Sequence, residues 1–220
     1  MHQLQPQPEV TTSLQLNYLS TSNSVDYLDR VQLAPWVNLQ TEALQVEWLI
    51  LHFNHWFSHL NVTLIKGDFE PEYFPATSDT SARIQFAHGF FNSALHEISH
   101  WTIAGEERRK LADLGYWYAP DGRTAEQQAL FEQVEIKPQA IEWLFAQAFG
   151  RKFRVSLDNL TGDGGNGSTF KDNVFEQLQK YFNGEAKLPR DAERFIHCIC
   201  ICCRAGQPLQ IDEFKREMLD

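Results

Sequence analysis

The sequence predicts an α+β fold in which helices pack around a small sheet. Two short segments, 62–66 and 82–86, carry β-branched or alternating apolar residues, which favours strands. Longer segments around them repeat apolar residues every three to four positions, as amphipathic helices do. Helical runs around a few strands, without regular alternation of the two, are typical of the α+β class.

Composition and charge exclude several classes of protein. The 220 residues are 43% hydrophobic and 22% charged, the balance of one globular domain. The net charge of −10 disfavours direct nucleic-acid binding, because phosphate contacts need clustered Lys and Arg. The N-terminus lacks the basic start and apolar run of a secretory signal, and no apolar stretch approaches the ~20 residues of a membrane span. We therefore expect a cytoplasmic protein without a direct nucleic-acid or membrane partner.

The chain divides near residue 40. Residues 1–40 are rich in Gln, Ser, Thr, Asn and Pro without periodicity, which predicts a poorly ordered N-terminal arm. Within this arm, Tyr18, Leu19 and Trp36 are expected to pack locally at most. Residues 41–220 are predicted to form a single domain.

The elements of that domain follow in order. An apolar helical stripe begins after Thr41, its predicted N-cap, and continues to Trp56. The two strands flank an acidic, proline-bounded segment, 67–75, which is expected to be a loop. The remaining predictions are a helix over 89–104 ended by Gly105, a helix over 124–149 interrupted at Pro138 and ended by Gly150, an extended segment at 153–157, a glycine-rich loop at 161–168, and helices near 169–183, 190–204 and 210–218.

The strongest chemical signal is the HExxH motif His96-Glu97-Ile98-Ser99-His100. On a helix, residues i and i+4 share one face, so both imidazoles can reach one metal ion, as on a zincin-like HExxH helix. Glu97 then faces the open position of the metal and is the candidate catalytic residue. The motif also occurs by chance, but its place after a strand and a turn favours a catalytic metal-binding domain over 41–220.

Two histidines need a third protein ligand, and the next long helix offers Glu132 and Glu135. Pro138 cannot donate to the carbonyl of Val134, so the helix is expected to kink or restart beside Glu135. A carboxylate from this helix completes a set that serves both zinc hydrolases and non-haem iron oxygenases. The alternative is that Glu135 is an exposed helical carboxylate.

Other motifs indicate less chemistry. The cysteines crowd into His197–Cys203 without the separated pairs of zinc sites, which predicts buried free thiols. His52, His55 and His59 share a helical spacing but are expected to be solvated or core-edge residues. The glycines of 162–167 lack the Lys-Ser/Thr ending of a phosphate loop.

Longer blocks of the sequence resemble the elongation factor P hydroxylase family. The blocks are Phe86–Gly105, Gly115–Arg123, Val134–Ala140 and Leu64–Asp68, which cover most of residues 60–160. The resemblance implies a bacterial monooxygenase that hydroxylates the lysine of elongation factor P already carrying a β-lysyl group. It also implies a metal held by two histidines and a glutamate, which by motif fall on His96, His100 and Glu135.

The resemblance further implies Fe(II) as the cofactor, O2 as co-substrate and β-lysylated elongation factor P as the partner. The alternative is a zinc-dependent, peptidase-like hydrolase, because zinc accepts the same ligands and Glu97 would deprotonate zinc-bound water. A purely structural metal is the third interpretation, although two histidines and one carboxylate leave a coordination position open.

The implied substrate is long and doubly cationic. Its pocket needs carboxylates for the ammonium groups and aromatic walls for the methylene stem. Residues of both kinds lie in the blocks that frame the metal motif. The candidates are Asp68, Glu70 and Glu72 in the acidic segment, and Asp113, Tyr116, Trp117, Tyr118 and Asp121 after the HExxH helix.

Overall fold

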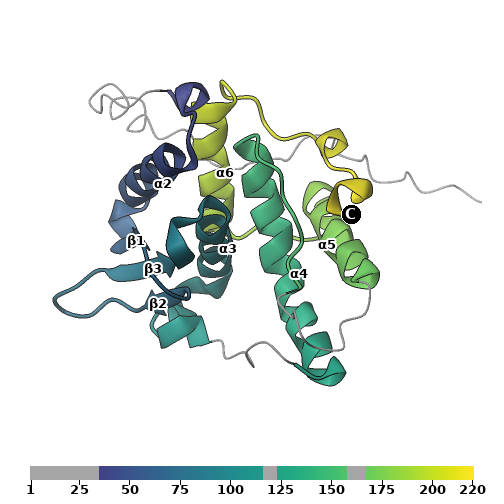
Figure 1. Ribbon diagram of the computed structural model, residues 1–220, viewed down its shortest axis with the longest axis horizontal. Helices are drawn as coiled ribbons and strands as arrows, with labels where there is room; N and C mark the ends of the chain where they lie inside the picture. The colour runs from purple at the N-terminus through teal and green to yellow at the C-terminus, as the bar shows by residue number, and fades with distance from the viewer. Residues whose placement is uncertain (1–34, 116–122, 158–166) are drawn as a thin grey trace, which may run out of the picture.

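A computed structural model describes residues 35–115, 123–157 and 167–220, and its class is the predicted one, α+β (Figure 1). Helices dominate, and the strands form one small mixed sheet. The helices are α2 (Glu42–Trp56), α3 (Phe91–Arg108), α4 (Ala125–Ala148), α5 (Ser168–Phe182) and α6 (Arg190–Cys203), and the strands are β1 (Val62–Lys66), β2 (Glu72–Phe74) and β3 (Ala82–Phe86).

The sheet has the strand order β1-β3-β2. β1 runs parallel to β3, with Leu64 opposite Ile84, and β2 runs antiparallel to β3, with Tyr73 opposite Ile84. Both predicted strands are confirmed with their boundaries. The loop predicted over 67–75 is wrong at its end, where β2 lies, because a three-residue strand with one buried side chain is too short to show alternation.

The first two long helices begin and end close to where the sequence placed them. The Thr41 hydroxyl accepts a hydrogen bond from the backbone N–H of Leu44 and so caps α2 as predicted. α3 begins at Phe91, and its regular backbone is broken at Gly105, whose φ of 68° suits glycine best. The chain then makes a further turn to Arg108. α2 packs on β1 and α3 packs on β3.

α4 begins with a capping box between Thr124 and Gln127. The expected restart at Pro138 is wrong, because α4 is continuous from Ala125 to Ala148. Proline removes one helical hydrogen bond. However, α4 packs against α3, α5 and α6, and Pro138 itself is buried, so tertiary contacts hold the helix together. The chain leaves α4 through Gly150, whose φ is 70°.

The C-terminal third differs from the predictions at its last helix. The segment 153–157 joins no strand and runs beside α4, where the Gln139 side chain pairs with both backbone groups of Ser156. The helix predicted near 210–218 is two short 3-10 helices, Ile211–Glu213 and Arg216–Leu219. Most of the predicted glycine-rich loop lies outside the described residues.

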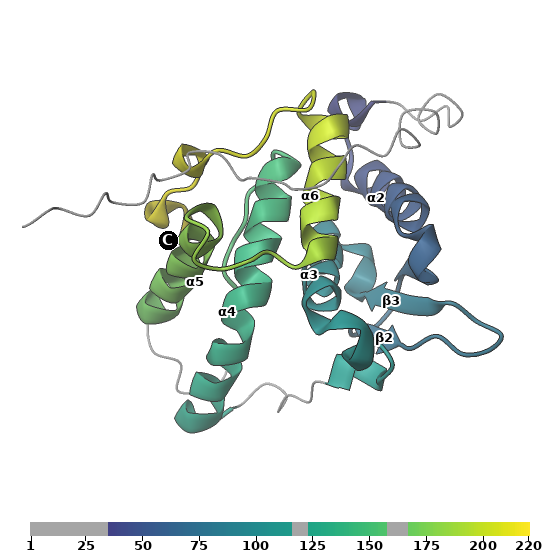
Figure 2. The ribbon, with the colours of Figure 1, turned by 180° about the vertical axis from the view of Figure 1, so that it is seen from behind.

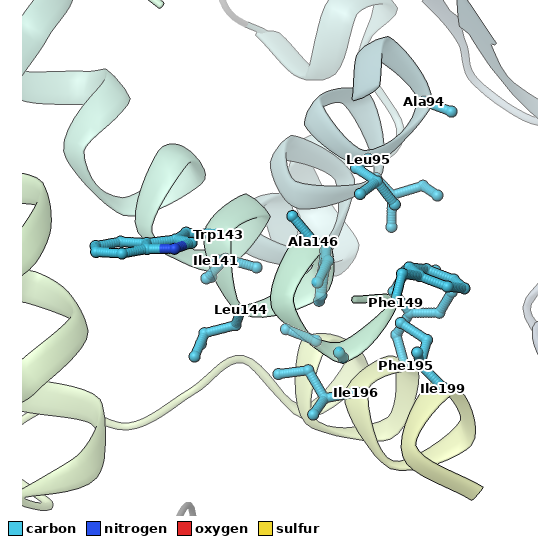
Figure 3. Close-up of a cluster of buried hydrophobic side chains, with 14 of the residues drawn as sticks. Ala94, Leu95, Ile141, Trp143, Leu144, Ala146, Phe149, Phe195, Ile196 and Ile199 are labelled. Carbon is cyan, nitrogen blue, oxygen red and sulfur yellow. The ribbon is translucent and has the colours of Figure 1, made fainter. Parts of the chain in front are cut away.

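The core lies where α3, α4 and α6 meet, with α2 and the sheet on one side and α5 on the other (Figures 1 and 2). Leu95 of α3, Leu144 of α4 and Phe195 of α6 all belong to this core and have no exposed surface (Figure 3). Burying large apolar side chains in this way is the main source of stability in such a fold. Within the described ranges, no helix is long and apolar enough to cross a membrane.

The end of the predicted N-terminal arm belongs to this core. Trp36 is only 9% exposed, and its ring packs against Trp48, Phe91 and Phe149. The prediction that residue 36 lies in a poorly ordered arm is therefore wrong, because a single Trp among polar residues shows no periodicity. Tyr18 and Leu19 lie outside the described residues.

Candidate metal centre

Side chains from α3 and α4 converge on one point. The Nε2 atoms of His96 and His100 are 3.1 Å apart. The Glu135 carboxylate lies 3.2 Å from His100 Nε2 through Oε1 and 3.6 Å from His96 Nε2 through Oε2. Atoms that each lie about 2.0–2.2 Å from one ion are on the order of 3–3.5 Å apart, so this spacing suits a single metal ion.

The donor set also fits a metal. Among the described residues, these three form the group whose ligand atoms gather within 4.8 Å of one another. Two imidazole nitrogens and one carboxylate oxygen leave coordination positions open, as in catalytic zinc and non-haem iron sites. Glu135 is 1% exposed, so the alternative of an exposed helical carboxylate is wrong. Glu132 instead accepts a hydrogen bond from Gln128 and lies outside the group.

The charges around the centre are strongly coupled. Burial raises the pKa of Glu135, but the charges of His100 and His96 and hydrogen bonds from His100 and Gln139 outweigh it and hold that pKa at about 2. Burial lowers the pKa of His96, but the hydrogen bond and charge of Glu142, with Glu135 and Glu97, raise it to about 10. The carboxylates therefore favour positive charge at His96, whether a proton or a metal ion supplies it.

Two further side chains of α4 support the centre, and neither was predicted. Glu142 Oε2 lies 2.8 Å from His96 Nδ1, on the side of the ring away from His100. Gln139 donates a 3.4 Å hydrogen bond to Glu135 while it pairs with the backbone of Ser156. A signal was available, since residues 135, 139 and 142 form a polar stripe at helical spacing on a largely buried helix.

A cavity of about 620 Å³ opens onto the centre. Its walls come from the segment around β2, from α3, from α4 and from residues 113, 154 and 156. Glu97, the predicted catalytic residue, lines this cavity, and its pKa is raised, first by burial and also by Glu135 and Glu142, although His96 and His100 lower it. A carboxyl group poised in this way can exchange a proton with a bound molecule.

The predicted substrate residues divide into three groups. Glu70, Glu72 and Asp113 line the cavity, and Asp113 Oδ1 also accepts the backbone N–H of Tyr73 at 3.1 Å. Asp68 is exposed and is absent from the cavity wall. The four remaining candidates, Tyr116, Trp117, Tyr118 and Asp121, lie outside the described residues.

Two further lining residues were not predicted. Phe131 contributes an aromatic surface, and the Arg123 guanidinium lies 3.9 Å from the centre of its ring. Arg154 is the one Lys or Arg side chain among the lining residues that the structure describes. The wall is therefore predominantly acidic, with an aromatic patch close to Glu135, and it suits a cationic ligand.

The other motifs are absent from this centre. All four cysteines are free thiols, as predicted; Cys198 and Cys200 are buried, whereas Cys202 and Cys203 are half-buried. Burial raises the pKa of Cys198 and of Cys200 to about 11. His52 is fully buried, at the core rather than at its edge, and its Nδ1 lies 2.7 Å from the Trp48 carbonyl. Neither the cysteines nor the histidines of α2 gather into a metal-binding group in the described part of the chain.

Comparisons with known proteins point to one family. A family model described as elongation factor P hydroxylase matches residues 52–214, a range that contains every residue of the centre. A protein named elongation factor P lysine hydroxylase, from Haemophilus influenzae, is 50% identical to this chain over 151 residues. That alignment covers 68% of this chain and 84% of the relative.

Proposed function

The chain belongs to the elongation factor P hydroxylase family, and from this we propose that it hydroxylates the β-lysylated lysine of elongation factor P. The main support for the proposal is that His96, His100 and Glu135 lie together in the wall of an acidic cavity. All three residues fall within the range that the family model matches, 52–214. A translation factor as the partner also implies that the enzyme works in the cytoplasm.

The proposed cofactor is Fe(II), held by the two Nε2 atoms and the Glu135 carboxylate, with O2 as the co-substrate. A lysine side chain reacts at a methylene carbon, whose hydrogens no side-chain base can remove at a useful rate. When bound, the iron would supply the redox chemistry with O2 that breaks a C–H bond of this methylene group. The ligand set is compatible with iron, because non-haem iron oxygenases use two histidines and one carboxylate; zinc sites use the same donors, so the choice of iron rests on the family's hydroxylase chemistry.

The residues of the chain bind and orient the substrate. The lysine with its β-lysyl extension carries two ammonium groups along an apolar stem, and Glu70, Glu72 and Asp113 offer carboxylates at the β2 side of the cavity. Phe131 lies on the α4 side, close to Glu135, where it can contact methylene groups. An unmodified lysine has one ammonium group fewer to bind, which supports a preference for the lysylated factor.

The role of Glu97 differs between this proposal and the alternative of a zinc hydrolase. In a hydrolase, Glu97 would be the general base, and its loss would cost ~10²–10⁴ in rate. In the hydroxylase, Glu97 supports the site electrostatically and no proton is taken from water. We expect Glu97→Gln to retain most hydroxylation, measured as product formed per minute by enzyme with full iron occupancy.

The deciding experiment is intact-mass spectrometry of elongation factor P. Iron-loaded enzyme, a reductant and O2 should add one oxygen atom to the β-lysylated factor and little to the unmodified factor. Matched reactions without O2, and with zinc-loaded enzyme, should add none. Unchanged mass in the complete reaction, together with cleavage of a peptide by the zinc form, would move the assignment to the hydrolase.

A further inference from the structure

Glu142 is a buried carboxylate with a specific partner. The residue is 8% exposed, and its Oε2 lies 2.8 Å from Nδ1 of His96, a residue 46 positions earlier in the chain. A carboxylate removed from water is costly unless it is hydrogen-bonded or paired. The contact with His96 meets that need, and it joins α4 to α3 directly beside the metal centre.

The geometry also determines which ring nitrogen of His96 can bind a metal. In a neutral imidazole, one nitrogen carries the proton and the other carries the lone pair. Because a carboxylate can only accept, Nδ1 must be the donor toward Glu142. The lone pair then belongs to Nε2, the nitrogen that lies 3.1 Å from His100 Nε2 and 3.6 Å from Glu135 Oε2.

Glu142 cannot be a further ligand in this arrangement. The two nitrogens face opposite sides of the imidazole ring, so an ion bound at Nε2 lies across the ring from Glu142. This agrees with the gathered ligand atoms, which include Glu135 and leave Glu142 out. The two carboxylates of α4 therefore have different tasks, although they occupy the same face of one helix.

We infer that Glu142 is a positioning residue that fixes the Nδ1–H tautomer and the orientation of His96 for metal binding. Such a partner raises the basicity of the ligand and removes the freedom of the ring to rotate or to exchange tautomers. The inference rests on the proposed metal centre and is independent of the substrate. A merely structural tie between α3 and α4 would leave the tautomer of His96 unaffected.

Zinc titration of purified full-length variants tests how much Glu142 contributes to the affinity of the protein for zinc. Glu142→Ala is expected to weaken zinc binding by about 10- to 100-fold, the usual effect of losing such a partner. Glu132→Ala is the matched control, because it removes a half-buried carboxylate from the same helix but outside the cavity, and it should bind zinc like the wild type. Wild-type affinity in Glu142→Ala would overturn the inference.

Histidine-ring NMR of the zinc-loaded proteins tests the tautomer itself. The wild type should show a protected, downfield Nδ1–H resonance for His96, and Glu142→Ala should lose it. Glu142→Gln keeps the size of the side chain and an accepting oxygen, so the resonance should persist but move upfield, because a neutral amide accepts a weaker bond than a carboxylate. An unchanged resonance in Glu142→Gln would overturn the inference even if Glu142→Ala does not fold.

These measurements also distinguish the role of Glu142 from the proposed hydroxylase function. A wild-type protein that binds neither zinc nor Fe(II) would remove the metal centre and the role of Glu142 together. Metal binding with normal dependence on Glu142, but without hydroxylation of the factor, would support Glu142 and contradict the proposed function.

Discussion

The indole nitrogen of Trp36 donates a 3.1 Å hydrogen bond to the carbonyl oxygen of Phe149, a residue 113 positions further along the chain. The rings of Trp36 and Phe149 also pack together, with their centres 4.8 Å apart. A residue that precedes the first long helix is thus bound to the end of α4, the helix that carries Glu135.

Trp36→Ala is expected to lower the free energy of unfolding by about 3–5 kcal/mol, because it empties a large core site and leaves a buried carbonyl without its donor. Urea denaturation measures the change. Val37→Ala is the control, since Val37 is 72% exposed and should change stability by less than about 0.5 kcal/mol. A deletion of residues 1–36 removes the same indole and should be comparably costly; a deletion variant as stable as the wild type would contradict this account.

Alanine substitution of His96, His100 or Glu135 should each abolish hydroxylation and strongly reduce bound metal, because each removes a proposed donor atom. Metal content after dialysis and product mass are the two measurements. His59→Ala and Glu132→Ala are matched controls that lie outside the gathered ligand atoms. Full occupancy and turnover in Glu135→Ala would mean that the third ligand lies elsewhere.

Glu70→Gln and Glu72→Gln should each raise the KM for β-lysylated factor by about 2- to 5-fold, the effect of losing one exposed charge pair. Metal content should stay unchanged, because neither residue reaches the ligand atoms. Asp113→Asn should act in the same direction, with an added effect through its bond to Tyr73. Asp68→Asn, outside the cavity wall, is the control, and an equal effect there would indicate general electrostatic attraction rather than a binding site.

His52 should make the fold sensitive to mild acid. Burial lowers its pKa from 6.5 to about 4, although the Trp48 carbonyl opposes the shift. The unfolded chain therefore takes up this proton first, and stability falls as the pH drops from about 6.5 to 4, by about 3 kcal/mol in all. Urea denaturation across that range measures the slope. His52→Leu should show a shallower slope than the wild type, and equal slopes would exclude His52 as the cause.

Local patterns in the sequence predicted most of the fold. β1 and β3 were found with their ends because their apolar residues repeat within five positions, and α2 because Thr41 precedes a long stripe. β2 was missed because three residues cannot show a period. Trp36 was missed because its partners come from distant segments, and no local pattern indicates a contact with Phe149.

The same limit applies to the centre. The spacing of His96 and His100 is a property of one helix, so the sequence alone placed both on one face. Glu135 needed the family resemblance, because a helical glutamate has the same local pattern whether it is exposed or buried. Glu142 was missed because its role depends on a hydrogen bond with His96 of another helix, which no local pattern in the sequence indicates.

The continuity of α4 across Pro138 constrains the number of residues between Glu135 and Glu142 as well as their type. Glu135 and Glu142 occupy one face because seven residues are close to two helical turns. One residue inserted between them would rotate everything beyond it by about 100° and shift it by about 1.5 Å along the axis. The carboxylate of Glu142 would then point away from His96, while Glu135 kept its place beside His100. A change of one residue in length would therefore break one of these two contacts completely. An insertion or deletion between Glu135 and Glu142 therefore breaks the contact between Glu142 and His96 in a single step.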